Sequence, residues 1–140
     1  MDPASILGII SFGFSVFEKV DELVRALKGA PEQLRALRES CMIVKVLLQR
    51  LNKTSERGSY ELLNRSELGL FGQLEERART CLHGVDAVVQ KVMKHTKTDT
   101  GEEVIGRWKC FIKRGEFEDM SENLRSLRES LTMILMVTQS

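Results

Sequence analysis

The sequence has few of the residues that interrupt or cross-link a chain. Its 140 residues contain two prolines and three cysteines, and 6% are aromatic, while 42% are apolar and 29% are charged. This composition is typical of a soluble helical bundle, and the length is that of one domain with its own core. The cysteines Cys41, Cys81 and Cys110 are odd in number and far apart. They favour reduced, core-type cysteines of an intracellular protein over a disulfide framework.

The chain carries almost no excess of positive or negative charge, and it lacks the sequence motifs of catalysis. The formal net charge of +1 argues against a dedicated nucleic-acid binder. The sequence has no glycine-rich phosphate loop and no cysteine or histidine pair with metal-ligand spacing. Carboxylates alternate with basic residues as on solvated helix faces. We therefore predict that the protein is not an enzyme and needs no cofactor or metal.

One stretch departs from this ordinary composition. Pro3–Phe17 contains no charged side chain, and it opens a helix predicted over Met1–Lys28. The uncharged run is about 15 residues long, which is short of the roughly 20 that span a bilayer. Its first half is apolar nearly all round, with Leu7, Phe12 and Phe14 pointing away from the common apolar face. Two interpretations stay open: a core helix, or a core helix that can also leave the core.

Apolar residues at helical spacing predict four further helices. They are predicted over about Pro31–Asn52, Ser66–His95, Glu102–Arg114 and Glu116–Gln139. Long helical periods joined by polar turns, without an alternating strand pattern, predict an all-α fold. We expect a four-helix bundle with an additional short helix before the last long helix, forming a single domain over 1–140.

Two finer expectations concern packing. In the second helix, an apolar seam predicts contact with neighbours, and further apolar residues beside it suggest that this helix is touched on two sides. The seam is Leu34, Leu37, Cys41, Val44, Leu48 and Leu51, and the residues beside it are Met42, Ile43, Val46 and Leu47. In the third helix, Gly84 suggests a close helix–helix approach. In the short fourth helix, Trp108 is more consistent with a core plug than with an interfacial anchor.

A basic stretch lies between Lys91 and Arg114. Its cations are Lys91, Lys94, Lys97, Arg107, Lys109, Lys113 and Arg114. If these residues share one end of the bundle, each would gain about 1 kcal/mol near anionic lipid headgroups. Two alternatives remain open: an ordinary solvated rim, or intramolecular pairing with the acidic segment Glu116–Glu122.

Three segments resemble a known family. They are the opening Met-Asp-Pro-Ala-Ser-Ile-Leu-Gly-Ile-Ile, the stretch from Arg107-Trp108-Lys109 to Glu116, and Leu-Arg-Glu-Ser-Leu-Thr-Met-Ile-Leu in the last helix. Together they resemble the HeLo-like N-terminal domains of fungal NLR-type (STAND) receptors and their ankyrin-bearing relatives. The resemblance implies a four-helix bundle related to the membrane-acting domains of mixed-lineage kinase-like proteins and some plant resistance receptors.

The resemblance also implies a function in regulated cell death and innate immunity. A sensor domain, in the same chain or a partner chain, would oligomerise, and the apolar first helix would then reach the membrane. The implied insertion residues are Ile6, Leu7, Ile9, Ile10, Phe12, Phe14 and Phe17. We expect a cytoplasmic N-terminal part of a longer receptor that is recruited to anionic lipids of the plasma membrane and self-associates, with no nucleic-acid partner. The alternative is a soluble interaction or oligomerisation module without membrane activity.

Overall fold

The computed structural model describes residues 3–27, 29–56, 65–93, 101–113 and 115–139. These residues form five helices: α1 (Pro3–Ala26), α2 (Glu32–Glu56), α3 (Arg65–Val92), α4 (Gly101–Lys113) and α5 (Glu116–Gln139). Within the described ranges there is no strand, so the predicted all-α fold is confirmed.

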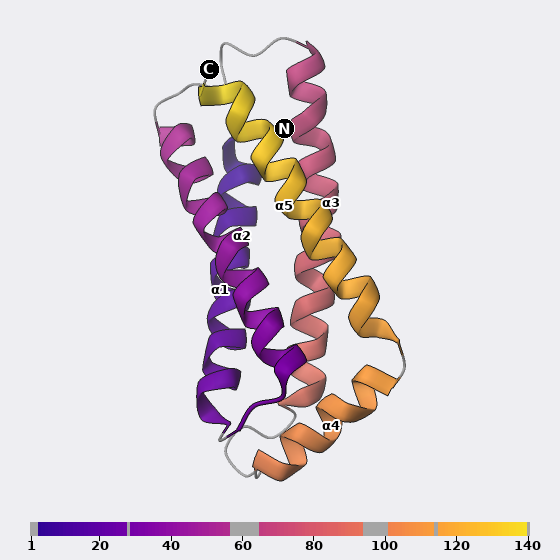
Figure 1. The fold of residues 1–140 in the computed structure, drawn as a ribbon. Coiled ribbons are helices and arrows are strands. Elements are labelled where there is room, and N and C mark those ends of the chain that lie inside the picture. Colours follow the sequence, from indigo (N-terminus) through magenta and orange to yellow (C-terminus); the bar gives the residue numbers. More distant parts are fainter. Residues whose placement is uncertain (1–2, 28, 57–64, 94–100, 114, 140) are drawn as a thin grey trace.

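The four long helices enclose a common core. α1 packs against α2 and α3, and α5 packs against the same two helices from the other side. α1 and α5 therefore lie diagonally opposite each other. The shorter α4 lies across one end of the molecule and contacts α3 and α5 (Figure 1).

The apolar seam predicted for the second helix forms part of this core, together with a similar row of residues on α5. All six seam residues of α2 are buried, and so are Met120, Leu124, Leu127, Leu131 and Ile134 of α5. Burying a leucine of this kind stabilises a fold by about 1.5–3 kcal/mol. Valines are poor helix formers in isolation, so the burial of Val85, Val88, Val89 and Val92 stabilises the end of α3.

An aromatic cluster fastens α4 to the molecule. Trp108 is only 1% exposed, and its ring lies 5.4 Å from Phe111 and 5.9 Å from Phe117 between centroids. The interpretation of Trp108 as a core plug is therefore confirmed. The turn that brings Phe117 onto the cluster depends on Gly115, whose φ of +74° lies in the left-handed region that glycine adopts without strain.

Two packing expectations need correction. Two helices, α1 and α5, do contact α2, and Leu47 packs against the core, but Met42, Ile43 and Val46 are exposed instead of covered. A Cβ atom added to Gly84 would meet nothing within 4 Å, so no neighbouring helix approaches closely there. α2 also ends later than predicted, at Glu56, with the Thr54 hydroxyl donating to the Arg50 carbonyl oxygen at 3.0 Å.

Candidate functional site

The front half of α1 presents its apolar residues to three different environments. Ile9, Ile10 and Phe17 are buried in the core, whereas Phe12 and Phe14 are half-buried against it. Leu7 is 50% exposed. The side chain of Ile6 lies outside the described residues. The expectation that Leu7 points away from the core is confirmed. The same expectation is wrong for Phe12 and Phe14, which are half-buried and pack against the core.

Phe12 lies in a shallow groove between α1 and α3. Its ring lies 5.1 Å from that of His83, centroid to centroid, with a tilt of 44°. Gly8, Ile9, Arg79 and Leu82 complete the lining of this groove. A groove beside a half-buried aromatic ring leaves one side of Phe12 accessible without moving the helix.

At Gly13, α1 lies close to both of its neighbouring helices. A Cβ atom at this position would lie 2.7 Å from Cδ1 of Leu48 on α2 and 3.7 Å from Cδ1 of Leu82 on α3. The close approach therefore occurs at Gly13 and not at Gly84. The sequence offered a weak signal, because glycine within a helix costs about 1 kcal/mol relative to alanine and so suggests a packing reason.

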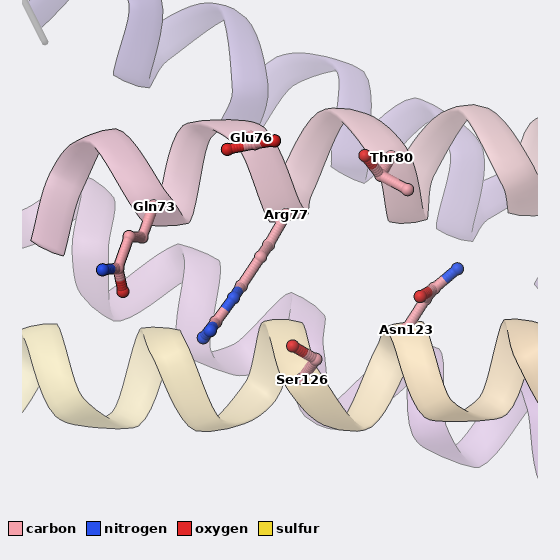
Figure 2. Close-up of a pocket in the computed structure, with 6 residues that line it drawn as sticks. All are labelled: Gln73, Glu76, Arg77, Thr80, Asn123 and Ser126. Atoms are coloured by element: carbon pink, nitrogen blue, oxygen red, sulfur yellow. The ribbon is translucent and has the colours of Figure 1, made fainter.

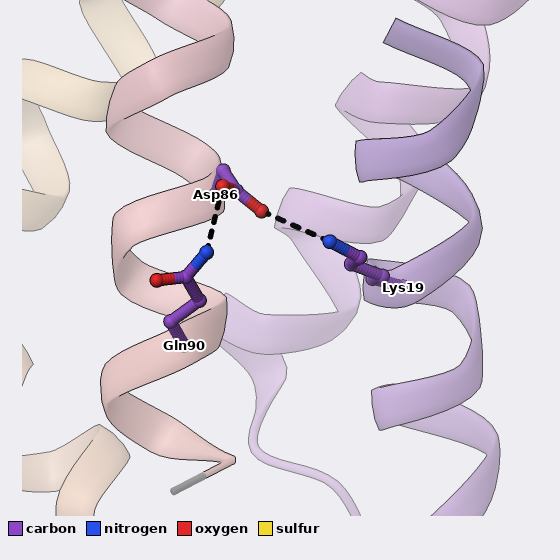
Figure 3. Close-up of polar contacts among 3 residues, drawn as sticks. All are labelled: Lys19, Asp86 and Gln90. Carbon is purple, nitrogen blue, oxygen red and sulfur yellow. Dashed lines mark hydrogen bonds and ion pairs between the residues drawn. The ribbon is translucent and has the colours of Figure 1, made fainter. Parts of the chain in front are cut away.

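The ion pairs that tie α1 to other described helices lie in its second half. Lys19 contacts Asp86 of α3 at 3.4 Å, and Gln90 donates to the same carboxylate at 2.9 Å (Figure 3). Asp21 contacts Arg38 of α2 at 2.8 Å. The front half has no charged residue up to Phe17. Its attachment therefore depends on apolar packing, which includes the close contact at Gly13.

The structure places the predicted basic residues in different situations. Lys91 on α3 and Lys109 on α4 are exposed. Arg107 is partly buried, donates to the Val92 carbonyl oxygen at 3.1 Å and lies 3.9 Å from the Glu103 carboxylate. Its guanidinium therefore caps the end of α3. Lys94, Lys97 and Arg114 lie outside the described residues, as does the side chain of Lys113, so a shared basic surface stays a prediction.

A polar groove runs along the surface where α3 and α5 pack together. Gln73, Glu76, Arg77 and Thr80 of α3 face Asn123 and Ser126 of α5, and the Arg77 side chain extends toward α5 (Figure 2). Arg77 donates to the hydroxyl of Ser130, a buried polar residue of α5. Neutral amides and hydroxyls with one charge of each sign give this groove no bias toward an ionic ligand.

The thiols have little nucleophilic character in the core. Burial raises the pKa of the Cys81 thiol to about 12. Burial also raises the pKa of the Cys41 thiol, and electrostatic repulsion from the nearby Cys81 raises it further. Cys110 is exposed. Among the residues that the structure describes, no group of three or more histidine, cysteine, aspartate or glutamate side chains is arranged to hold a metal ion.

A second exposed apolar surface was not expected from the sequence. Met42, Ile43 and Val46 follow one another on the outer side of α2, and Met133 and Met136 lie exposed on α5. The helical pattern contained this signal, but the seam spacing alone did not show which side has a neighbour.

Over the described part of the chain, no helix combines the length and apolar character needed to cross a membrane. No protein-family model, curated protein or solved structure matches this chain.

Proposed function

We propose that the protein is a membrane-targeting effector bundle of the HeLo-like kind, with α1 as its membrane-contacting element. The four long helices would form the bundle and α4 an accessory helix that closes one end. As the resemblance to fungal NLR-type proteins implies, the protein would act in regulated cell death without enzymatic activity. It would be recruited from the cytoplasm to the plasma membrane.

The supporting observation is the asymmetry of α1. Its uncharged front half carries an exposed Leu7 and half-buried Phe12 and Phe14, while its contacts through Lys19 and Asp21 lie further along. Moving the front half onto a lipid surface would therefore separate no ion pair of the described residues. The buried Ile9, Ile10 and Phe17 would add apolar area once the helix had moved.

Vesicle binding tests this proposal with two matched variants. Leu7 on α1 and Val46 on α2 are 50% and 47% exposed, so Leu7→Glu and Val46→Glu place the same charge at similarly exposed apolar sites. Sedimentation and dye leakage are measured with vesicles of phosphatidylcholine and phosphatidylserine. We expect Leu7→Glu to lose binding and Val46→Glu to retain it, with both variants melting as the original protein does.

A second candidate function is self-association or partner binding without membrane activity. The exposed Met42, Ile43 and Val46 favour it, because a contiguous apolar helix surface is typical of an interface. Light scattering after size exclusion then separates the two. A stable dimer that does not sediment with vesicles, and that becomes a monomer in Val46→Glu, would overturn the membrane proposal and favour the interaction module.

A further inference from the structure

A groove with an apolar floor lies between the end of α3 and α4. Val88 and Val92 of α3 and Phe111 of α4 contribute buried apolar side chains, and Gly106 leaves the α4 side open. Its volume is about 580 Å³. Small-molecule sites usually occupy 300–1,000 Å³ and are lined mainly by apolar groups with a few polar ones.

The charges on the rim differ in their availability. The Arg107 guanidinium is engaged by the Val92 carbonyl oxygen at 3.1 Å and lies 3.9 Å from Glu103, so these two charges largely offset each other. Lys91 also lines the groove, is exposed, and pairs with no carboxylate among the described residues. The groove therefore combines an apolar floor with one net positive charge at its edge.

Gly106 keeps the floor open, although packing does not require glycine there. A Cβ atom at this position would meet nothing within 4 Å. Glycine inside a helix costs about 1 kcal/mol relative to alanine, so α4 gives up stability at a site where a side chain would have room. A larger side chain at this position would extend into the groove that Gly106 lines.

We propose that this groove binds a single-chain anionic amphiphile, with its acyl chain on the floor and its carboxylate or phosphate at Lys91. The apolar floor selects the chain, and the exposed ammonium of Lys91 selects the sign of the head group. The ligand is held as a monomer, so this binding does not rest on the release of α1 or on any vesicle. It would remain even if the protein has no membrane activity.

Decanoate is the probe, titrated by calorimetry at concentrations where it is monomeric and no lipid is present. We expect saturable binding to the original protein, and binding at least about tenfold weaker, or about 1.4 kcal/mol, for the uncharged decanol. Decanoate should also slow alkylation of Cys110, which lines the same groove and is exposed. Absence of saturable decanoate binding would overturn the proposal, and equal binding of decanol would remove the role of Lys91.

Two pairs of variants locate the site. Gly106→Leu should abolish decanoate binding without lowering the melting temperature, because leucine favours a helix more than glycine does. Gly72→Leu, at another exposed helical glycine with open space, should bind decanoate normally. Lys91→Glu should weaken binding at least about tenfold. Lys109→Glu makes the same charge change on exposed α4 outside the groove and should have little effect. Unchanged binding in Gly106→Leu would place the ligand elsewhere and overturn the assignment.

Discussion

Leu48 of α2 occupies the space that any side chain at position 13 of α1 would need. Its Cδ1 atom lies 2.7 Å from the position of a Cβ atom built on Gly13. Leu48 is fully buried, so its side chain has little room to turn aside. The absence of a side chain at one residue thus sets how closely α1 lies on the rest of the core.

Enlarging this residue should loosen α1. Gly13→Val forces overpacking against Leu48 and Leu82, and such changes cost about 1–3 kcal/mol. We expect that loss in urea unfolding, together with stronger sedimentation with anionic vesicles because the apolar front half is less firmly held. Gly8→Val is the control on the same helix, since a Cβ atom there meets nothing within 4 Å. Equal effects of the two variants would contradict a packing role specific to Gly13.

The ion pair between α1 and α3 should contribute little stability but measurable coupling. Lys19 is about half-exposed and its nitrogen lies 3.4 Å from the Asp86 carboxylate. Exposed pairs of this type contribute about 0–1 kcal/mol. We expect Lys19→Glu to destabilise the fold by about 1 kcal/mol and Asp86→Lys in the same chain to restore part of the loss, as measured in a double-mutant cycle. A coupling energy of zero would show that the pair is a passive surface contact.

High pH should destabilise the fold through the buried thiols. The unfolded Cys81 thiol ionises near its ordinary pKa of 9, whereas the folded thiol has a pKa of about 12, so the unfolded state releases its proton first. The stabilising difference is complete below pH 9 and is lost as the pH rises toward 12.

Urea unfolding at several pH values checks this direction. Cys81→Ala should lose less stability between neutral and alkaline pH than the original protein does. Cys110→Ser, at an exposed cysteine, should follow the original protein, and lysine titration is common to all three chains. A steeper alkaline loss in Cys81→Ala would contradict the burial of this thiol.

The single tryptophan should report on the docking of α4. Trp108 is almost completely buried, and its ring packs on Phe111 and Phe117. We expect blue-shifted emission that acrylamide quenches poorly, and a loss of about 3–5 kcal/mol in Trp108→Ala. If α1 alone moves on vesicles, this emission should stay unchanged during binding. A red shift on binding would show that α4 detaches as well.

The sequence predicted the positions of the helices better than it predicted which surfaces of each helix pack against others. Helical spacing identified the buried seam from Leu34 to Leu51, because burial repeats with the turn of the helix. It could not show that Met42 and Val46 are exposed, since apolar spacing defines a face and not the partner that covers it. Gly84 and Gly13 were indistinguishable for the same reason, because the contact depends on side chains of other helices.

The candidate site was predicted in composition but not in environment. The uncharged front half of α1 was evident from the residues, whereas the degree of burial of Phe12 and Phe14 depends on the distance to α3 and the core. Arg107 was grouped with other cations by proximity in sequence. Its engagement by the Val92 carbonyl oxygen depends on how α4 crosses the end of α3, which no local pattern specifies.

The diagonal placement of α1 and α5 has a consequence for what remains if α1 departs. α5 contacts α2, α3 and α4, so it still connects every other helix when α1 is subtracted. The remainder is a continuous three-helix layer with α4 attached, and its newly uncovered strip is the surface formerly occupied by α1. Departure of α1 would thus create two apolar surfaces at once, one on the released helix and one on the faces of α2 and α3 that it had covered.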